Sequence, residues 1–508
     1  MGADGRALGG SRARDADLRG PSGVTAVGWP RLGLRACAAD EFRPIPHPRP
    51  GFVRPLPRLS IRAARAALAL ALLAAPPLAA QAVPNASGAA PAVPNVPPAE
   101  PAAAFQPPAP GGPYAVGSRW LPLADSARVD SLAPAPGPRQ LLVRLWYPAE
   151  RVPAGARPMP LWPGGLRFAR ALSAGLGAPP TLLDAAAAVP SHSYADAPVA
   201  RRGRPFPVVL FSHGYGQGFE SQNSAQMEEL ASRGYVVASI DHPYEVAAVV
   251  YPDGGPVLAG NVAQIRRLSG ELDSTTIAAV ARAAGATDSA ARVAAVRDIL
   301  ARTPTGQASV ARWTADTRFV LDELARRNTR GTTRDTTRGG SAPWPLAGAL
   351  DLTRLGVMGM SFGGAVAGDF CATDARCTAG VNLDGLQFGA VLDHPIARPM
   401  LFAASDQPGV TGVNDFAYLA TQAPAYRLVV RGSHHLNYTD FSLLAPVVRL
   451  PGVLGPVDPA RMEAIVSAYV VAFFDRHLKR AAAPLLDQRP SPFSEADFRA
   501  RAPGARER

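Results

Sequence analysis

The chain has 508 residues, of which 47% are hydrophobic, so it is long enough for a large buried core and more than one domain. Its net charge of +12 raises the question of nucleic-acid binding. Residues 1–65, however, hold 12 Arg and 5 acidic residues, so +7 of that charge lies there. The remainder is near balance and has no basic stripe with interleaved aromatic residues, so we expect no nucleic-acid partner.

The first 111 residues differ in composition from the rest. Residues 1–57 are rich in Arg, Pro, Gly and Ala without steady periodicity, which indicates disorder or an extension upstream of the true start codon. Residues 58–82 have a basic start, a short apolar run and a small-x-small cleavage site, which is typical of a signal peptide. An uncleaved anchor is the alternative. We expect a secreted or periplasmic protein of bacterial origin, with residues 83–111 as a Pro/Ala-rich linker.

One stretch has the pattern of a nucleophile elbow. Residues 355–360 form an apolar run of strand length, Gly359-x-Ser361-x-Gly363 follows, and a small-residue helix start comes next. On so tight a turn the serine stands above the strand end, and the N–H of Phe362 can face a developing oxyanion. A Gly-rich turn that carries a serine by chance is the alternative.

A second Gly-rich loop, which begins at His213, follows the buried-type strand predicted at residues 206–212. Its glycines allow a backbone N–H, that of Tyr215, to point into a site at the strand end. The alternative is a plain turn. Residues 224–233 predict a helix and residues 235–243 a further strand, and this spacing indicates a βαβ unit. The fold class is therefore α/β, with a mostly parallel central sheet flanked by helices.

Titratable residues end several of the predicted strands. They are Asp241 and His242 in 235–243, Asp384 in 379–385, Asp406 in 399–406, and the pair His434 and His435 in 426–435. Functional groups of parallel sheets collect at the carboxyl ends of strands, so all are candidates. In proteins with this elbow the chain order is serine, acid, histidine, which disfavours Asp241 and His242.

Residues 258–330 have apolar residues at helical spacing and no strand pattern. They predict a helical insertion before the nucleophile strand, over or beside the site, followed by a polar loop at 328–341. A further amphipathic helix is predicted at residues 464–479.

Cys371 and Cys377 lie close together after the elbow helix. In an exported chain such a pair indicates a disulfide, and two buried thiols are the alternative. No Cys/His cluster has the spacing of a metal site, and the chemistry expected of the elbow requires no metal or organic cofactor.

Four stretches together resemble the platelet-activating-factor acetylhydrolase family, the plasma and type II group (group VII phospholipase A2-like) of α/β-hydrolases. They are Phe211-Ser212-His213-Gly214, Gly359 to Gly364, Asn382-Leu383-Asp384, and residues 431–441, which read RGSHHLNYTDF. The elbow is shared by all α/β-hydrolases, whereas the last stretch is more discriminating. The resemblance runs from about residue 112 to residue 478, with gaps at 153–190 and 258–350.

The resemblance implies a triad of Ser361, Asp384 and His435, with the N–H groups of Tyr215 and Phe362 as the oxyanion hole. It selects Asp384 where the general α/β-hydrolase layout selects Asp406, and His435 rather than His434. The implied enzyme is a calcium-independent carboxylic ester hydrolase, similar to 1-alkyl-2-acetylglycerophosphocholine esterase. Its substrate would be a small-molecule or lipid ester, such as a short-acyl or oxidised phospholipid cleaved at sn-2, with transient contact to a membrane surface.

Two other functions are considered. The same machinery could act on another ester, as a secreted lipase, a short-chain esterase or a polyester hydrolase, because the sequence has no recognisable phosphocholine pocket. A non-catalytic binding protein on a hydrolase scaffold would have a broken triad, whereas all three partners occur in the expected order. The predicted organisation is an extension at 1–57, a signal peptide at 58–82, a linker at 83–111, a catalytic domain at 112–480 with a helical insertion and loop at 258–345, and a tail at 481–508.

Overall fold

The computed structural model describes residues 105–152, 154–175, 177–252, 254–329, 344–448 and 452–503. The predicted extension, the signal peptide and residues 83–104 of the linker lie outside the described residues. Residues 105–111, predicted as the end of the linker, contact the domain. The Gly111 N–H donates to Glu229 Oε2 at 2.6 Å, and His192 Nε2 lies 2.9 Å from the Pro107 carbonyl oxygen. The domain therefore begins no later than residue 105.

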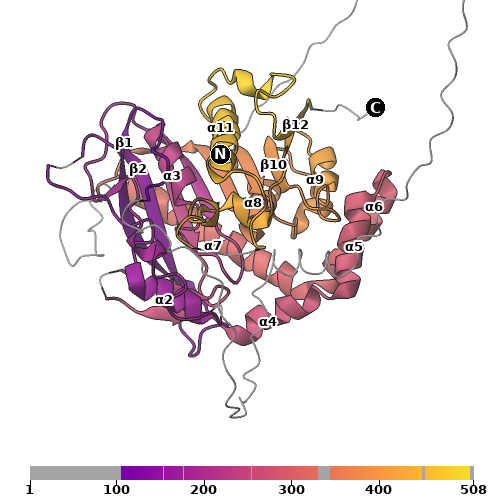
Figure 1. Ribbon diagram of the computed structural model, residues 1–508, viewed down its shortest axis with the longest axis horizontal. Helices are drawn as coiled ribbons and strands as arrows, with labels where there is room; N and C mark the ends of the chain where they lie inside the picture. Colours follow the sequence, from indigo (N-terminus) through magenta and orange to yellow (C-terminus); the bar gives the residue numbers. More distant parts are fainter. Residues whose placement is uncertain are drawn as a thin grey trace, which may run out of the picture. The chain divides into compact units, whose positions relative to one another are not determined.

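A ten-stranded sheet forms the centre of the domain, in the order β12-β11-β10-β9-β8-β4-β5-β2-β1-β3 (Figure 1). From β5 to β11 in this order all neighbours are parallel, and β2 is antiparallel to both β1 and β5. This order, with an elbow after β8, is the α/β-hydrolase fold that the sequence predicts. The strands are β1 Ala115–Val129, β2 Pro138–Ala149, β3 Ser193–Ala195, β4 Phe206–Ser212, β5 Val236–Asp241, β8 Leu350–Met360, β9 Ala379–Leu383, β10 Met400–Ser405, β11 Ala425–Val430 and β12 Ala496–Arg501.

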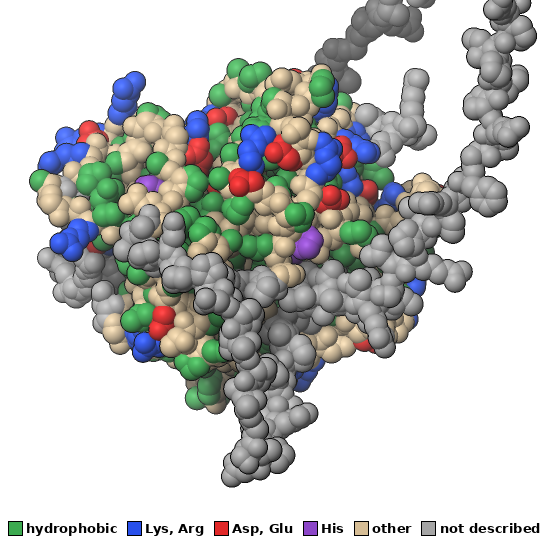
Figure 2. All heavy atoms as spheres, in the orientation of Figure 1, with side chains coloured by type: hydrophobic (Ala, Val, Ile, Leu, Met, Phe, Trp, Pro, Cys, Tyr) green, Lys and Arg blue, Asp and Glu red, His purple; other side chains and the backbone are tan. Residues whose placement is uncertain are grey.

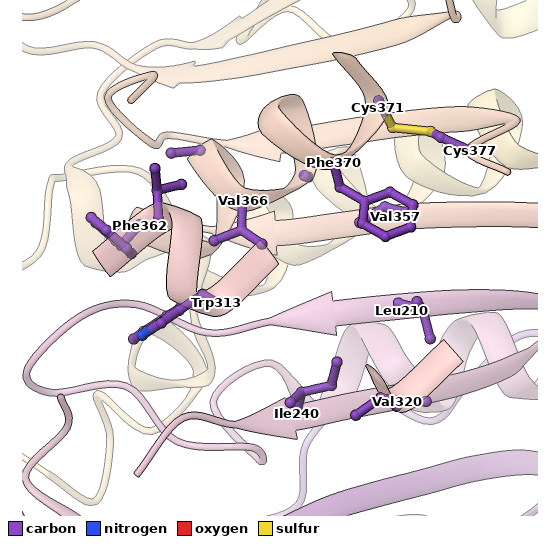
Figure 3. Close-up of a cluster of buried hydrophobic side chains, with 14 of the residues drawn as sticks. Leu210, Ile240, Trp313, Val320, Val357, Phe362, Val366, Phe370, Cys371 and Cys377 are labelled. Atoms are coloured by element: carbon purple, nitrogen blue, oxygen red, sulfur yellow. A yellow bond between two sulfur atoms is a disulfide. The ribbon is translucent and has the colours of Figure 1, made fainter. Parts of the chain in front are cut away.

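Alternate residues of each strand point to opposite faces of the sheet, and in the inner strands both sets are apolar. Helices therefore cover both faces. Leu210 of β4 and Val357 of β8 belong to a buried apolar cluster with α7 (Pro304–Thr329) and α8 (Phe362–Thr373), part of which Figure 3 shows. Phe211 and Met358 belong to a second cluster with α3 (Ser224–Ser232) and α11 (Pro459–His477). Burying an apolar side chain of this size stabilises the fold by about 1.5–3 kcal/mol.

The predicted insertion is helical, as expected, and consists of α4 (Val262–Glu271), α5 (Ser274–Gly285), α6 (Ser289–Arg302) and α7. Side chains of Asn261, Asp273 and Asp288 accept backbone N–H groups at the starts of α4, α5 and α6, which fixes where these helices begin. Figure 1 shows α4, α5 and α6 in succession along one side of the domain, whereas α7 packs on the sheet beside α8. The last insertion helix is thus part of the sheet's cover. Of the polar loop predicted at 328–341, residues 328 and 329 belong to α7, and residues 330–341 lie outside the described residues.

Several elements were not predicted. The hairpin of β6 (Ala248–Val250) and β7 (Val257–Ala259) has strands of three residues, too short to carry a periodic pattern. The helix α2 (Gly165–Gly175) lies in the Ala/Pro-rich stretch, and α9 (Asp415–Ala420) and α10 (Asp440–Leu443) each have fewer than two turns. No helix in the described part of the chain is both long enough and apolar enough to cross a membrane.

The prediction that residues 481–508 form a tail outside the domain is wrong for β12. This strand pairs antiparallel with β11, and Phe498 stacks on Tyr426 with ring centroids 6.0 Å apart. Half of its sequence, ADFRAR, is charged, as is common for an edge strand, and so it lacks the unbroken apolar pattern of the inner strands. The domain therefore extends to Arg501.

Cys371 and Cys377 form a disulfide, which decides between the two alternatives for this pair (Figure 3). The bond joins the last turn of α8 to the segment that leads into β9. On the face in Figure 2, basic side chains lie among acidic and apolar ones. Arg461 and Glu495 form an ion pair at 2.9 Å on the surface of the domain, where solvent screening leaves such a pair little effect on stability.

Candidate active site

Ser361 occupies a sharp turn between β8 and α8. Its backbone has φ 56° and ψ −123°, which a non-glycine residue adopts only under strain. A Cβ atom on Gly359 would lie 2.0 Å from the Gly363 carbonyl oxygen, and one on Gly363 would lie 1.9 Å from the Ser212 carbonyl oxygen. Both glycines of the motif are therefore required by backbone contacts, as the elbow interpretation expects.

Ser361, His435 and Asp384 form a continuous row of hydrogen bonds. His435 Nε2 lies 2.9 Å from Ser361 Oγ, and His435 Nδ1 lies 2.7 Å from Asp384 Oδ2. The other carboxylate oxygen, Asp384 Oδ1, accepts the Ser405 N–H at 2.7 Å. The Ser361 and His435 residues are only 4% and 7% exposed, so water screens their interaction weakly. This arrangement can transfer a proton from a hydroxyl to an imidazole held by a carboxylate.

The sheet places these residues because β8, β9 and β11 are parallel, so their carboxyl ends meet at one edge. Asp384 directly follows β9 with φ 54°, a left-handed conformation that Asp tolerates better than most residues. Its N–H donates to the Ala403 carbonyl at 2.8 Å, and Asn382 Oδ1 accepts the Gly385 N–H at 2.7 Å. The turn that carries the carboxylate is therefore fixed from both sides.

The two competing residues lie differently. Asp406 is exposed, and its Oδ2 accepts the Gly432 N–H at 3.0 Å. His434 is half-buried, and its backbone N–H donates to Asn437 Oδ1 at 2.8 Å. Within the part of the chain that the structure describes, neither side chain hydrogen-bonds to Ser361, Asp384 or His435.

The residues around His435 that carry the family resemblance hold its loop in place. Asn437 Oδ1 also accepts the Gly455 N–H at 2.7 Å. Asp440 accepts the N–H groups of Ser224, at 2.6 Å, and Ala225, at 3.3 Å, and so caps the start of α3. Burial raises the pKa of Asp440 well above its usual value. These two side chains are supports for the histidine, a role that the sequence motif did not specify.

The loop after β4 lies against the serine. A Cβ atom on Gly214 would be 3.3 Å from Ser361 Cβ, so the chain passes directly beside the nucleophile. Gln222 Oε1 accepts the Gly214 N–H at 2.8 Å. Among the described residues, the N–H groups of Tyr215 and Phe362 donate to no protein acceptor. Phe362 also begins α8, where the helix dipole favours negative charge. Both N–H groups therefore remain available to an oxyanion, and Gln222 is a support that sequence reasoning missed.

Two buried His–carboxylate pairs lie next to this loop. His213 Nε2 is 3.2 Å from Asp241 Oδ1, and His242 Nδ1 is 2.9 Å from Asp316 Oδ2. Burial lowers the pKa of both histidines to about 4. Asp241 and His242, which the strand-end argument admitted as candidates, thus bond to partners other than Ser361.

Glu220 is a buried acid beside Asp241. Burial first, and then the neighbouring Asp241 carboxylate, raise the pKa of Glu220 to about 8, although Arg144 opposes this. The native state therefore keeps a proton that the unfolded chain releases near the usual pKa of about 4.3. Stability is fully present below that lower pKa and falls as the pH rises toward 8.

We expect Glu220→Gln to flatten this fall, because the amide mimics the protonated acid and cannot titrate. Between about pH 6.5 and 8, above the range where the buried histidines titrate, the free energy of unfolding of the parent should drop by up to about 1.4 kcal/mol per pH unit more than that of the variant. Burial raises the pKa of the neighbouring Asp241 to about 7, so Asp241 titrates in the same range in both proteins, and it is the difference between the two slopes that reports on Glu220. Urea unfolding at several pH values measures both slopes. An equal or steeper slope in the variant would show that Glu220 is already ionised in the native state.

A cavity of about 40 Å³ is lined by Asp384 and His435, and also by Val280 of α5, Gln407 and Asn414. It is large enough for an ordered water beside Asp384 and His435. A hollow of about 330 Å³ is lined by β1, α2 and the β6–β7 connection, and includes none of the three hydrogen-bonded residues.

Comparisons with known proteins agree with this site. The family described as "Platelet-activating factor acetylhydrolase, isoform II" matches residues 102–257 and 339–484. The unmatched stretch between them is the helical insertion. A ferulic acid esterase from Streptomyces cinnamoneus, whose structure is solved, is 28% identical with a TM-score of 0.57; the similarity covers 78% of this chain and 99% of that one.

Three relatives are platelet-activating factor acetylhydrolases, from guinea pig (Cavia porcellus), cattle (Bos taurus) and chicken (Gallus gallus). They are 25%, 23% and 23% identical over 55%, 55% and 54% of this chain, and the alignments cover 59%, 58% and 63% of the relatives themselves. The chain thus spans about three fifths of their length. Because the family matches more than half of the chain, the protein belongs to the platelet-activating factor acetylhydrolase, isoform II family.

Proposed function

We propose that this protein is a serine carboxylic-ester hydrolase that works through an acyl-enzyme. The observation that carries the proposal is the hydrogen-bonded row from Ser361 Oγ through His435 to Asp384. Family membership and the similarity to a ferulic acid esterase support ester hydrolysis independently of that geometry.

In this mechanism Ser361 Oγ attacks the ester carbonyl carbon while His435 Nε2 takes the hydroxyl proton. Asp384 holds Nδ1–H toward itself, so that Nε2 is free to accept, and it stabilises the imidazolium that forms. The histidine then returns the proton to the leaving alcohol, and the C–O bond breaks to give the acyl-enzyme. Water attacks this ester by the same proton transfers in reverse order and releases the acid and free Ser361.

The negative charge on the carbonyl oxygen would be met by the N–H groups of Tyr215 and Phe362. Two observations support this role: among the described residues neither N–H group donates to a protein acceptor, and Gly214 lies beside Ser361. Removing one such donor typically costs about 2.7–4 kcal/mol of transition-state stabilisation, so two donors supply a large share of the acceleration.

For the substrate we propose a lipid ester, of the short-acyl or oxidised phospholipid kind cleaved at sn-2. The names of the three relatives and the family match support this class. A second candidate is the ester of an aromatic acid, because the similarity to the ferulic acid esterase covers 99% of that chain. A secreted lipase or polyester hydrolase would use the same residues on other esters.

We also propose that the protein acts outside the cytoplasm. The signal-peptide pattern at residues 58–82 and the Cys371–Cys377 disulfide support this, because disulfides persist in oxidising compartments.

A substrate panel with the purified protein tests the proposed function. It comprises p-nitrophenyl esters of increasing acyl length, a 2-acetyl phospholipid, an oxidised phospholipid and methyl ferulate, each with Ser361→Ala as the control. We expect Ser361-dependent hydrolysis, with the highest kcat/KM on the 2-acetyl or oxidised phospholipid. The highest value on methyl ferulate would favour the aromatic ester, and hydrolysis that survives Ser361→Ala would refute the proposed mechanism.

A further inference from the structure

Glu245 lies in the connection between β5 and β6, is fully buried, and has an unusual number of polar partners. Its carboxylate accepts from Arg312 at 2.8 Å and from Trp313 Nε1 at 2.8 Å, and also from Ser309 Oγ, all on α7. Gln264 of α4 lies at 3.4 Å. Every one of these partners can donate, so the site is built for an ionised carboxylate.

The same residue contacts the loop beside Ser361 in two ways. Its backbone carbonyl accepts the Gly216 N–H at 2.9 Å, and its carboxylate accepts the Tyr215 hydroxyl at 3.4 Å. The Tyr215 N–H lies in the peptide group between Gly214 and Tyr215, and Glu245 thus holds the loop at the Tyr215 side chain and at the residue that follows it. Glu245 therefore connects the loop to the insertion helices through one buried charge.

Aromatic packing links both proposed oxyanion donors, Tyr215 and Phe362, to Trp313 on α7. Trp313 stacks on Tyr215, with ring centroids 5.9 Å apart, and meets Phe362 edge-on at 5.0 Å. Figure 3 shows Trp313 and Phe362 side by side. The Tyr215 and Phe362 rings are themselves 5.1 Å apart. A shift of Trp313 would therefore reach the two residues whose N–H groups are the proposed oxyanion donors.

We propose that Glu245 is a positioning residue, which locks the Tyr215 loop onto α7 and thereby holds the oxyanion hole in its productive geometry. The proposal rests on the proposed function and adds that the insertion is required for assembly of the site. The physical reason is that a buried carboxylate surrounded by donors has one low-energy position, so it transmits the position of α7 to the loop.

Glu245→Gln is the test, because the amide keeps the shape but places an N–H₂ among donors and breaks the ion pair with Arg312. Thr314→Val is the matched control. Thr314 directly follows Trp313 on α7 and is buried, but its hydroxyl donates to Asp369 Oδ2 at 2.7 Å and not to the loop. For both variants we would measure kcat, KM, the affinity for a trifluoromethyl ketone that forms an oxyanion on the serine, and amide exchange of the peptide that contains Tyr215.

We expect Glu245→Gln to lower kcat by about 10- to 100-fold with KM changed less than about threefold, since a misaligned donor costs part of what a missing one costs. Inhibitor affinity should fall in parallel, and the Tyr215 peptide should exchange faster. Thr314→Val should lower the melting temperature while kcat stays within about twofold. If Glu245→Gln does not fold, Arg312→Met is the second variant, because the Arg312 side chain is 23% exposed in the parent. It should lower kcat and inhibitor affinity and speed exchange of the Tyr215 peptide in the same way.

An unchanged inhibitor affinity, or unchanged exchange of the Tyr215 peptide in a folded Glu245→Gln variant, would overturn the proposal. Equal losses of kcat in Thr314→Val would overturn it as well, because the effect would then be general destabilisation. Amide exchange does not depend on turnover, so it tests the locking of the loop even if the parent protein hydrolyses no ester. In that case the proposed function would fail and the inference about the loop would be judged separately.

Discussion

His435→Ala should abolish ester hydrolysis to near the detection limit, with a loss of kcat of about 10⁵- to 10⁶-fold. The reason is that His435 Nε2, 2.9 Å from Ser361 Oγ, is the group positioned to take the hydroxyl proton. Serine, base and acid act as one unit, so removing the base removes nearly all of what the unit contributes. Steady-state kinetics with an activated p-nitrophenyl ester measures the loss.

His434→Ala is the matched control, one residue away in the same loop. His434 holds the loop through its backbone N–H, which alanine retains, and its half-buried ring lies outside the hydrogen-bonded row. Turnover should stay within about tenfold of the parent, a barrier change of about 1.4 kcal/mol. If His434→Ala destroys activity and His435→Ala spares it, the histidine assignment is off by one residue.

Asp384→Asn should lower kcat by about 10⁴-fold with little change in KM. The asparagine can still accept the Ser405 N–H, but its amide nitrogen would then face His435 Nδ1, which lies 2.7 Å from the native carboxylate. The imidazole would have to accept at Nδ1, which leaves Nε2 protonated and unable to take the serine proton. The pH profile of kcat/KM on the activated ester should change with it.

Asp406→Asn tests the alternative position of the acid. Asp406 is exposed and accepts the Gly432 N–H at 3.0 Å, a bond that the amide oxygen can still make. Its turnover should remain within about tenfold of the parent. The opposite ranking of the two variants would show that the working carboxylate follows β10 rather than β9.

The features that could be predicted from the sequence are those that a local pattern determines. Unbroken apolar runs gave β4 and β5 almost residue for residue, because strands covered on both faces carry no polar alternation. The elbow was recognisable because Ser361 and its two glycines occupy fixed positions within five residues, although the contact that requires Gly363 is with the distant Ser212 carbonyl oxygen. The family resemblance then selected Asp384 over Asp406, which chain order and local spacing alone left open.

Other features depend on contacts between distant segments and left no such pattern. Glu245 follows β5 without any motif, and its partners on α7 are more than sixty residues away. Gln222 supports Gly214 through a bond that only the folded loop forms. The edge strand β12 pairs with a neighbouring strand on one side only, and its three charged residues interrupt the apolar pattern by which the inner strands are recognised. The state of Cys371 and Cys377 could not be decided from the sequence, because spacing does not distinguish a disulfide from two buried thiols.

Labelling with a fluorophosphonate, followed by peptide mapping, tests most directly whether Ser361 is an activated nucleophile. We expect one adduct on the intact protein, located on Ser361, formed at a rate that falls sharply in His435→Ala and stays close to the parent rate in His434→Ala. A folded protein that takes up no label at Ser361, or that is labelled on another serine, would contradict the assignment of this site as the active site of a serine hydrolase.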